Sequence, residues 1–171
     1  MHHLQLRGGS IGTGATATVH AGYYFAGSAH KVYAVKRFKA GREKDFVREK
    51  EALMRLRHLP GVLQLQDTGV VRHRPALVLE MCGHGDLMSV MEAIPGFGLP
   101  SRVARVYARQ LWSAVAAMHA RGVYHMDIKP ENCLIGSGDF ALKLCDFGFA
   151  HTEFDDVGST MDGTLLYMAP E

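Results

Sequence analysis

The sequence predicts an α+β fold in two parts: a five-stranded antiparallel sheet with one helix, followed by a mainly helical part. Three observations lead to this prediction. Runs rich in β-branched and aromatic residues, separated by glycine-containing turns, occupy most of the first 81 residues. One charged helical stretch interrupts these runs. Beyond residue 85 the spacing of apolar residues becomes helical, so strands and helices are segregated rather than alternating.

The first part divides at its turn residues. A helix is expected from Glu43 to about Leu59, where Pro60 and Gly61 end it. Strands are expected on both sides of this helix, at Leu4–Ile11, Thr18–Phe25, Lys31–Phe38, Val62–Val71 and Ala76–Met81.

The second part follows a short linker at residues 82–85. Pro100 and Ser101 open a helix that runs to about Ala120, and Gly122 ends it. From Val123 onward we expect short strands and loops. One face of the helix is apolar and therefore needs a packing partner; its residues are Val103, Tyr107, Leu111, Ala114 and Met118.

The composition of the 171 residues is that of a globular chain, with 47% hydrophobic and 21% charged residues. It excludes a disordered tail and a collagen-like fibre. No apolar run approaches the roughly 18 residues that span a bilayer, and the first residues lack the apolar core of a secretory signal. The three cysteines have no metal-binding spacing, so we expect reduced thiols in a cytoplasmic or nuclear protein.

The net charge of +2 conceals an asymmetry between the two parts. Residues 1–60 contain 11 Lys and Arg against 4 Asp and Glu, whereas residues 61–171 contain 8 against 13. A basic first part can indicate nucleic-acid binding. Most of these charges, however, are interspersed along residues 41–58, which favours a solvated helix face beside a nucleotide site and no nucleic-acid partner.

Gly12 and Gly14 lie between strand-like residues. Such a pair allows a tight turn whose N–H groups can approach phosphate oxygens, although a plain hairpin turn is the alternative. A strand rather than a helix follows, which excludes a dinucleotide-binding βαβ unit, and no Gly-Lys-Ser/Thr follows, which excludes a Walker A loop. Ala17 stands where a third glycine would complete a longer glycine pattern, and it costs little only if its φ is negative.

Lys36 shares its strand face with Val32 and Ala34. It either snorkels at a sheet edge or reaches an anion. The following helix carries Glu49 on the same stripe as Phe46, Leu53 and Leu56. A buried carboxylate needs a cation, and Lys36 is the natural candidate; the alternative is a solvated Glu49 at the edge of the stripe.

Asp127, Lys129 and Asn132 lie within six positions of one proline-containing loop. An acid that accepts a proton, a lysine beside a phosphate and an amide for a metal ion would suit phosphoryl transfer. Asp146 follows a short apolar run and precedes Gly148 by two residues. A carboxylate placed there suits Mg²⁺, which prefers one or two carboxylates together with phosphate oxygens.

Together these motifs resemble the protein kinase family. The glycine loop, Tyr33–Lys36, His125-x-Asp127, Asp146-Phe147-Gly148 and Ala169-Pro170-Glu171 occur in the order of that family, and the resemblance extends from about Leu4 to Glu171. Lys129 and Gly163-Thr164 resemble serine/threonine rather than tyrosine kinases. The residues around Asp127 and Asp146 are similar to those of calcium/calmodulin-dependent and plant-type calcium-dependent kinases.

The resemblance implies one kinase domain over residues 1–171, with an N-terminal lobe over 1–81 and a partial C-terminal lobe over 82–171. It also implies ATP and Mg²⁺ as cofactors and a protein hydroxyl as substrate. Asp127 would act as the base, Lys129 would lie beside the γ-phosphate, and Asn132 with Asp146 would ligate Mg²⁺. Lys36, braced by Glu49, would bind the α- and β-phosphates, and Leu79 would lie at the gatekeeper position. The remaining nucleotide contacts would come from Ile11, Gly12, Gly14, Val19, Ala34, Leu134, the backbone of Glu80 and Cys82, and Asp86 at the ribose.

Two departures from the family pattern have consequences. Met126 replaces the arginine that usually pairs with a phosphorylated activation loop, so we expect that phosphorylation of Ser159, Thr160 or Thr164 is not needed for that contact. The family also has a helical subdomain after the Ala-Pro-Glu motif, so the sequence reads as a fragment. We therefore expect the apolar face of the helix at residues 101–120 to lose most of its cover.

Two functions other than that of an active protein kinase are the alternatives. The chain could be a catalytically impaired kinase fragment that binds a nucleotide or a partner without turnover. A small-molecule phosphotransferase with a kinase-like fold is the other alternative, which Lys129 and Gly163-Thr164 disfavour. The motifs name neither the protein substrate, nor the upstream regulator, nor the oligomeric state.

Overall fold

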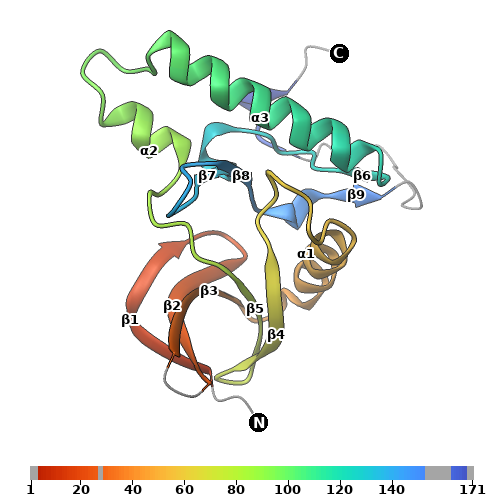
Figure 1. The fold of residues 1–171 in the computed structure, drawn as a ribbon. Coiled ribbons are helices and arrows are strands. Elements are labelled where there is room, and N and C mark those ends of the chain that lie inside the picture. The colour runs from red at the N-terminus through yellow and green to blue at the C-terminus, as the bar shows by residue number, and fades with distance from the viewer. Residues whose placement is uncertain (1–3, 27–28, 153–162, 169–171) are drawn as a thin grey trace.

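The computed structural model describes residues 4–26, 29–152 and 163–168, and it places a curled sheet lobe below a helical lobe (Figure 1). The sheet has the strand order β1-β2-β3-β5-β4, and each neighbouring pair is antiparallel. The predicted five-stranded sheet is confirmed. Its strands are β1 (Leu4–Thr13), β2 (Ala17–Ala26), β3 (Ala29–Phe38), β4 (Leu65–Val71) and β5 (Arg74–Glu80).

The strand predicted from Val62 begins three residues later in the structure. Gly61, Val62 and Leu63 instead pair with Leu144 in the helical lobe: Leu63 N–H donates to the Leu144 carbonyl at 2.9 Å, and Leu144 N–H donates to the Gly61 carbonyl at 2.8 Å. Val62 and Leu63 are buried at this junction. The segment before β4 therefore joins the two lobes rather than extending the sheet.

Helix α1 (Glu43–Arg55) lies against the sheet and ends four residues before the predicted end at Leu59. The side chain of Gln64 explains this difference. Its amide oxygen accepts from His58 N–H at 2.7 Å, and its amide nitrogen donates to the carbonyls of Leu59 and Val62 at 3.1 and 2.8 Å. These bonds satisfy backbone groups in the turn after α1, so the chain can leave the helix early.

The helical lobe contains α2 (Leu87–Glu92) and α3 (Ser101–His119), with short strands beneath them. Strand β6 (Val123–Tyr124) pairs with β9 (His151–Thr152), and β7 (Cys133–Ile135) pairs with β8 (Leu142–Leu144). Single 3₁₀ turns lie at η1 (Pro130–Asn132), η2 (Phe147–Phe149) and η3 (Leu165–Tyr167). Helix α3 and the short strands were predicted, whereas α2, with six residues, was not.

The expectation that the apolar face of α3 would lose most of its cover is wrong. Ala114 and Met118 are 2% and 0% exposed, and Tyr107 and Leu111 are partly buried against the core. Only Val103, at 38%, is open to solvent. The reason is that α3 packs on β6 and on β8, so the strands that follow it in sequence provide the cover.

One hydrophobic core extends through both lobes. The sheet lobe contributes apolar side chains of β3, α1 and β5, and the helical lobe contributes those of α3, β8 and η2. Buried members include Phe38, Leu53, Leu56, Leu77, Leu79, Met118, Val123, Leu142, Leu144 and Phe147. Because this core is continuous, it fixes the polar residues at the junction of the lobes.

Gly61 is tightly packed at the junction, and we predict that Gly61→Ala destabilises the fold. Its φ is +79°, and a Cβ at this position would lie 2.8 Å from Cβ of Ala114 on α3. A left-handed alanine costs about 1–2 kcal/mol, and overpacking adds about 1–3 kcal/mol. Chemical denaturation should therefore show an unfolding free energy lower by about 2 kcal/mol or more.

Gly69→Ala in β4 is the matched control. No heavy atom lies within 4 Å of its added Cβ, and its φ is outside the left-handed region. The two variants should differ clearly in denaturation midpoint, and equal midpoints would show that the junction is not tightly packed.

Candidate active site

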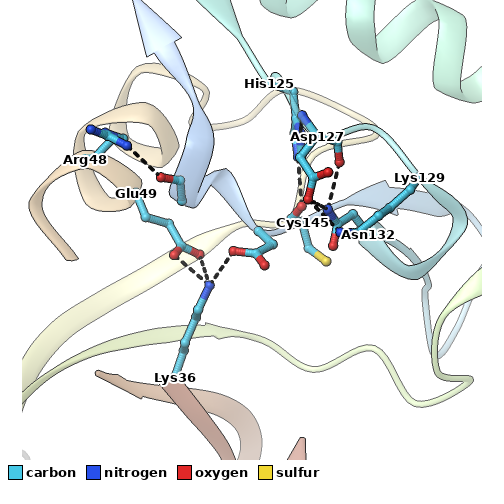
Figure 2. A network of polar contacts seen from close by, with 10 residues as sticks. Lys36, Arg48, Glu49, His125, Asp127, Lys129, Asn132 and Cys145 are labelled. Carbon is cyan, nitrogen blue, oxygen red and sulfur yellow. Dashed lines mark hydrogen bonds and ion pairs between the residues drawn. The ribbon is translucent and has the colours of Figure 1, made fainter. Parts of the chain in front are cut away.

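Lys36 of β3 and Glu49 of α1 form a buried ion pair. The Lys36 Nζ lies 2.8 and 2.6 Å from the two carboxylate oxygens of Glu49 (Figure 2). Lys36 is 8% exposed and Glu49 is 2% exposed, so neither a snorkelling lysine nor a solvated glutamate is correct. Burial alone would lower the pKa of Lys36, but the carboxylates of Glu49 and Asp146 outweigh it and raise that pKa. Lys36 is therefore positively charged inside the protein.

Asp146 shares the same ammonium group. Its Oδ1 lies 2.8 Å from Nζ of Lys36, and its side chain is 46% exposed. Burial opposes its ionisation, but Lys36 outweighs burial and holds the pKa of Asp146 below its ordinary value. The residue has a left-handed backbone with φ of +61°, at the turn between β8 and η2. This turn aims an ionised carboxylate at the junction between the lobes.

A second cluster surrounds Asp127, which is 5% exposed. Its Oδ2 lies 2.8 Å from Nζ of Lys129 and 3.1 Å from Nδ2 of Asn132. Its Oδ1 accepts a hydrogen bond of 2.6 Å from the hydroxyl of Thr164. Burial would raise the pKa of Asp127, but the hydrogen bonds and charge of Lys129, with Thr164 and Asn132, lower it. Asp127 is therefore an ionised carboxylate held by three donors.

His125 connects the two clusters and is 1% exposed. Its Nδ1 accepts from Asp127 N–H at 3.2 Å, so the proton is on Nε2, which donates to the Cys145 carbonyl at 2.9 Å. Cys145 directly precedes Asp146 in the chain. Burial lowers the pKa of His125, so the ring is neutral near pH 7.

Both lobes contribute residues around the proposed nucleotide site. Val19 of β2 pairs in register with Lys36, and Ala34 of β3 pairs with Leu79 of β5. From the helical lobe, Leu134 of β7 forms a backbone bridge with Asp86. The Asp86 carboxylate accepts the N–H and the hydroxyl of Ser89, each at 2.8 Å, so it also caps α2.

Gly12 and Gly14 have φ values outside the left-handed region, and a Cβ at either would meet its nearest atom at 3.9 Å. The fold itself therefore does not require glycine at these positions, and the missing side chains leave room for the close approach of a ligand. Ala17 is 3% exposed and its φ is not positive, so the alanine at the third position is accommodated without strain. Ile11, which precedes Gly12 in β1, is 58% exposed.

Ser137, in the turn between β7 and β8, holds the linker after β5 in place through two hydrogen bonds. Ser137 Oγ accepts from Gly83 N–H at 2.7 Å and donates to the Met81 carbonyl at 3.1 Å. Lys143 pairs with the Glu80 carboxylate at 2.7 Å, and Glu80 N–H donates to the Gln64 carbonyl at 3.0 Å, so the side chain and the N–H of Glu80 are both occupied. Burial raises the pKa of the Cys82 thiol to about 11, which keeps it protonated.

Two contacts in the site were not predicted. The hydroxyl of Thr164 lies 2.6 Å both from Asp127 and from Lys129, whereas the sequence indicated Thr164 as a mark of serine/threonine kinases and as a site of phosphorylation, with no contact to Asp127. The signal in the sequence was the Gly163-Thr164 pair; in the structure Gly163 has a φ of +117°, and an added Cβ would lie 2.6 Å from the Met126 carbonyl oxygen. Arg48 donates to the Gly148 carbonyl at 3.1 Å and attaches α1 to the turn after Asp146. Ser159 and Thr160 lie outside the described residues.

The donors expected for Mg²⁺ are oxygen atoms of two residues. Within residues 4–26, 29–152 and 163–168 there is no cluster of three or more His, Cys, Asp or Glu side chains suited to a metal ion. Asn132 uses its amide nitrogen to hold Asp127, and Asp146 is ionised and partly exposed. One amide oxygen and one carboxylate fit Mg²⁺, which keeps several ligands from water and phosphate.

We predict that His125 makes the protein less stable as the pH falls from about 7 to about 5. The unfolded chain takes up a proton near pH 6.5, whereas the folded chain does so only at the lowered pKa. Protonation of Nδ1 would also break the bond to Asp127 N–H. Across this window the unfolding free energy should fall by up to about 1.4 kcal/mol per pH unit because of this group.

The test compares unfolding free energies from pH 5 to 7 in His125→Gln and in His119→Gln, whose parent histidine is exposed on α3. The slope should flatten in His125→Gln and persist in His119→Gln. An unchanged slope in His125→Gln would contradict the assignment of a buried neutral ring.

Comparison with known proteins agrees with this geometry. Residues 6–171 match the family model of the protein kinase domain. CBL-interacting protein kinase 4 of Oryza sativa subsp. japonica is 44% identical over 136 residues, which cover 77% of this chain and 30% of that protein. Human serine/threonine-protein kinase ULK3 is 36% identical over 167 residues, which cover 94% of this chain and 35% of that protein.

A third relative is CBL-interacting serine/threonine-protein kinase 16 of Arabidopsis thaliana. It is 34% identical over 177 residues, which cover 94% of this chain and 37% of that protein. The chain thus spans about a third of the length of these relatives. No helix in the described part of the chain is long and apolar enough to cross a membrane. Two of these relatives are named as serine/threonine-protein kinases, and the chain belongs to the protein kinase domain family.

Proposed function

We propose that the protein containing this chain transfers the γ-phosphate of ATP to a serine or threonine hydroxyl of a protein substrate. The single observation that supports this most is the ionised Asp127, held by Lys129, Asn132 and Thr164. A buried carboxylate with a lowered pKa and a nearby ammonium group suits the orientation of a hydroxyl for attack on a phosphate.

Asp127 would orient the substrate hydroxyl and accept its proton. Its Oδ1 already accepts a hydrogen bond from one hydroxyl, that of Thr164, at 2.6 Å. A substrate hydroxyl can be received in the same way, because a carboxylate oxygen accepts more than one hydrogen bond. Lys129, 2.8 Å from the other oxygen, would place a positive charge beside the transferring phosphate.

Lys36 would bind the α- and β-phosphates. Its ammonium is held by Glu49 and keeps its charge in a buried position, so the positive charge that a phosphate requires is already in place. Asn132 and Asp146 would hold Mg²⁺, which neutralises the phosphate charge when it is bound. Asp146 contacts Lys36 directly, so the metal-binding and phosphate-binding residues are adjacent in the structure.

Adenine would lie between Ile11, Val19 and Ala34 of the sheet lobe and Leu134 of the helical lobe. The backbone of Glu80 and Cys82 would bind its edge, and Asp86 would bind the ribose. The contacts that Ser137 and Lys143 make with residues 80–83 support this arrangement, because they fix the linker between the lobes.

No contact in the described residues favours a binding module without turnover. Each polar group that phosphoryl transfer requires is paired with a partner that orients it. The contact of Thr164 with both Asp127 and Lys129 also favours a protein substrate over a small molecule, since it holds the Gly163-Thr164 segment, which would position a peptide, at the loop that carries Asp127.

Asp127→Asn should reduce phosphoryl transfer by about a hundredfold or more, since an amide cannot accept the proton. The measurement is transfer of labelled phosphate from Mg²⁺-ATP to a generic protein substrate by the whole protein. Asp139→Asn is the matched control, because Asp139 is exposed and its one hydrogen bond, to Ala141 N–H, can be kept by an amide oxygen.

The control should retain activity, and both variants should unfold at the temperature of the parent within a few degrees. If Asp127→Asn retained most of the activity while Asp139→Asn did the same, the assigned base would be wrong. Nucleotide binding without transfer by the parent protein would instead support the binding module.

We further expect that replacing Ser159 and Thr160 together by alanine leaves turnover within about threefold of the parent, since Met126 offers no cation to a phosphate. Thr164→Ala is the comparison, because it removes the hydroxyl that joins Asp127 and Lys129. It should reduce turnover by about tenfold or more. Steady-state kinetics that showed the larger loss in the double variant would contradict this prediction.

A further inference from the structure

A second polar feature lies in the sheet lobe, and neither Asp127 nor Lys36 belongs to its lining. Residues at the ends of β2, β3 and the β4–β5 hairpin line a hollow of about 250 Å³. Its polar side chains are Thr18, Arg37, Lys39, Arg72 and Arg74, and no acidic side chain lines it. We call this the basic hollow.

The topology of the sheet brings these cations together from distant parts of the sequence. Thr18 of β2 pairs in register with Arg37 of β3, and Arg37 in turn pairs with Ala76 of β5. Val71 pairs with Arg74, so Arg72 and His73 form a two-residue turn. Antiparallel pairing therefore places the end of β3 beside this turn, although about 35 residues separate them in sequence.

The four cations lack acidic partners within the described part of the chain. Lys39 donates to the Gly14 carbonyl at 2.7 Å, and no described carboxylate forms an ion pair with Arg37, Arg72 or Arg74. In α1, by contrast, acids alternate with cations along the sequence, and Asp45 pairs with Arg42. Like charges gathered without a counterion repel each other, so an anion in the basic hollow would relieve that repulsion.

The β4–β5 turn adds an independent observation. Arg72 and His73 have φ values of +49° and +60°. Two-residue turns of this kind favour Asn-Gly, because other side chains are strained at positive φ. The turn thus carries an arginine where local stability favours a smaller residue, and strain retained in this way is typical of functional positions.

From these observations we infer that the basic hollow binds the phosphate group of a phosphorylated serine or threonine side chain of a protein. A phosphate dianion offers three strong acceptor oxygens, and the planar arginine fork binds two of them at once. The Thr18 hydroxyl adds a donor. This binding would not depend on ATP or on phosphoryl transfer by Asp127.

The shape of the site distinguishes this ligand from nucleic acid. The cations converge on one hollow instead of forming a track along a surface, and single-stranded nucleic acid also needs aromatic rings on which bases stack. The aromatic ring that lines the hollow, Phe38, is 1% exposed and packs edge-on against Phe46 of α1. No ring in the lining is therefore free to stack on a base.

The test uses a ¹⁵N-labelled full chain and a seven-residue peptide with one phosphoserine among alanine and glycine residues. Amide shifts of Thr18, Lys39 and Arg72 report binding in the basic hollow. The double variant Arg72→Gln/Arg74→Gln should weaken binding by about tenfold or more. Arg102→Gln/Arg105→Gln is the matched control, since it removes the same charge from two exposed positions of α3 and should bind as the parent does.

Companion titrations separate the other sources of negative charge. The same peptide with serine or glutamate should bind at least about tenfold more weakly, because it carries less charge and fewer acceptor oxygens. Inorganic phosphate should compete for the same amides at a higher concentration than the phosphopeptide.

Four outcomes would overturn the inference: unchanged amides at millimolar phosphopeptide, equal binding of the glutamate peptide, inorganic phosphate as tight as the phosphopeptide, or equal weakening in both double variants. Tighter binding of single-stranded DNA or of vesicles with phosphoinositides, also lost in Arg72→Gln/Arg74→Gln, would overturn it too. Because only binding is read, failure here leaves the test of phosphoryl transfer unaffected.

Discussion

The structure depends above all on one buried ammonium group, that of Lys36, shared by Glu49 and Asp146. A buried charge is tolerated only when it is paired, and removing one partner of a buried pair costs about 3–5 kcal/mol. Each of the three residues belongs to a different element: β3, α1 and the turn after β8. The position of α1 relative to the helical lobe is therefore fixed by charge as well as by apolar packing.

This ion cluster is continuous with the loop that carries Asp127. From Asp146 the chain passes to Cys145, whose carbonyl accepts from His125, and His125 in turn accepts from Asp127 N–H. Asp146 and Met126, at the two ends of this connection, both have left-handed backbones. Such conformations cost about 1–2 kcal/mol each in non-glycine residues, and they persist only where surrounding contacts hold them. Here the buried histidine and the lysine supply those contacts.

The sequence predicted best where periodicity placed a charge on an apolar face. Glu49 stood on the buried stripe of a helix, and this alone implied a cation such as Lys36. It failed where one side chain decides the backbone, as Gln64 does after α1, and where a helix is too short for a periodic pattern, as α2 is. The role of Thr164 was also hidden, because its contact with Asp127 joins residues 37 positions apart.

The charge asymmetry shows that the linear sequence does not reveal which charges lie together in space. The excess of cations in residues 1–60 suggested a solvated helix face, and in α1 the cations do alternate with acids. Much of the remaining excess lies in β3 and just after it: Lys36 is neutralised by two carboxylates, whereas Arg37 and Lys39 are not. The cations that join them, Arg72 and Arg74, belong to the part of the chain whose net charge is negative. Sums over segments therefore do not show that Arg37, Lys39, Arg72 and Arg74 lie together, and only the register of β3, β5 and β4 does.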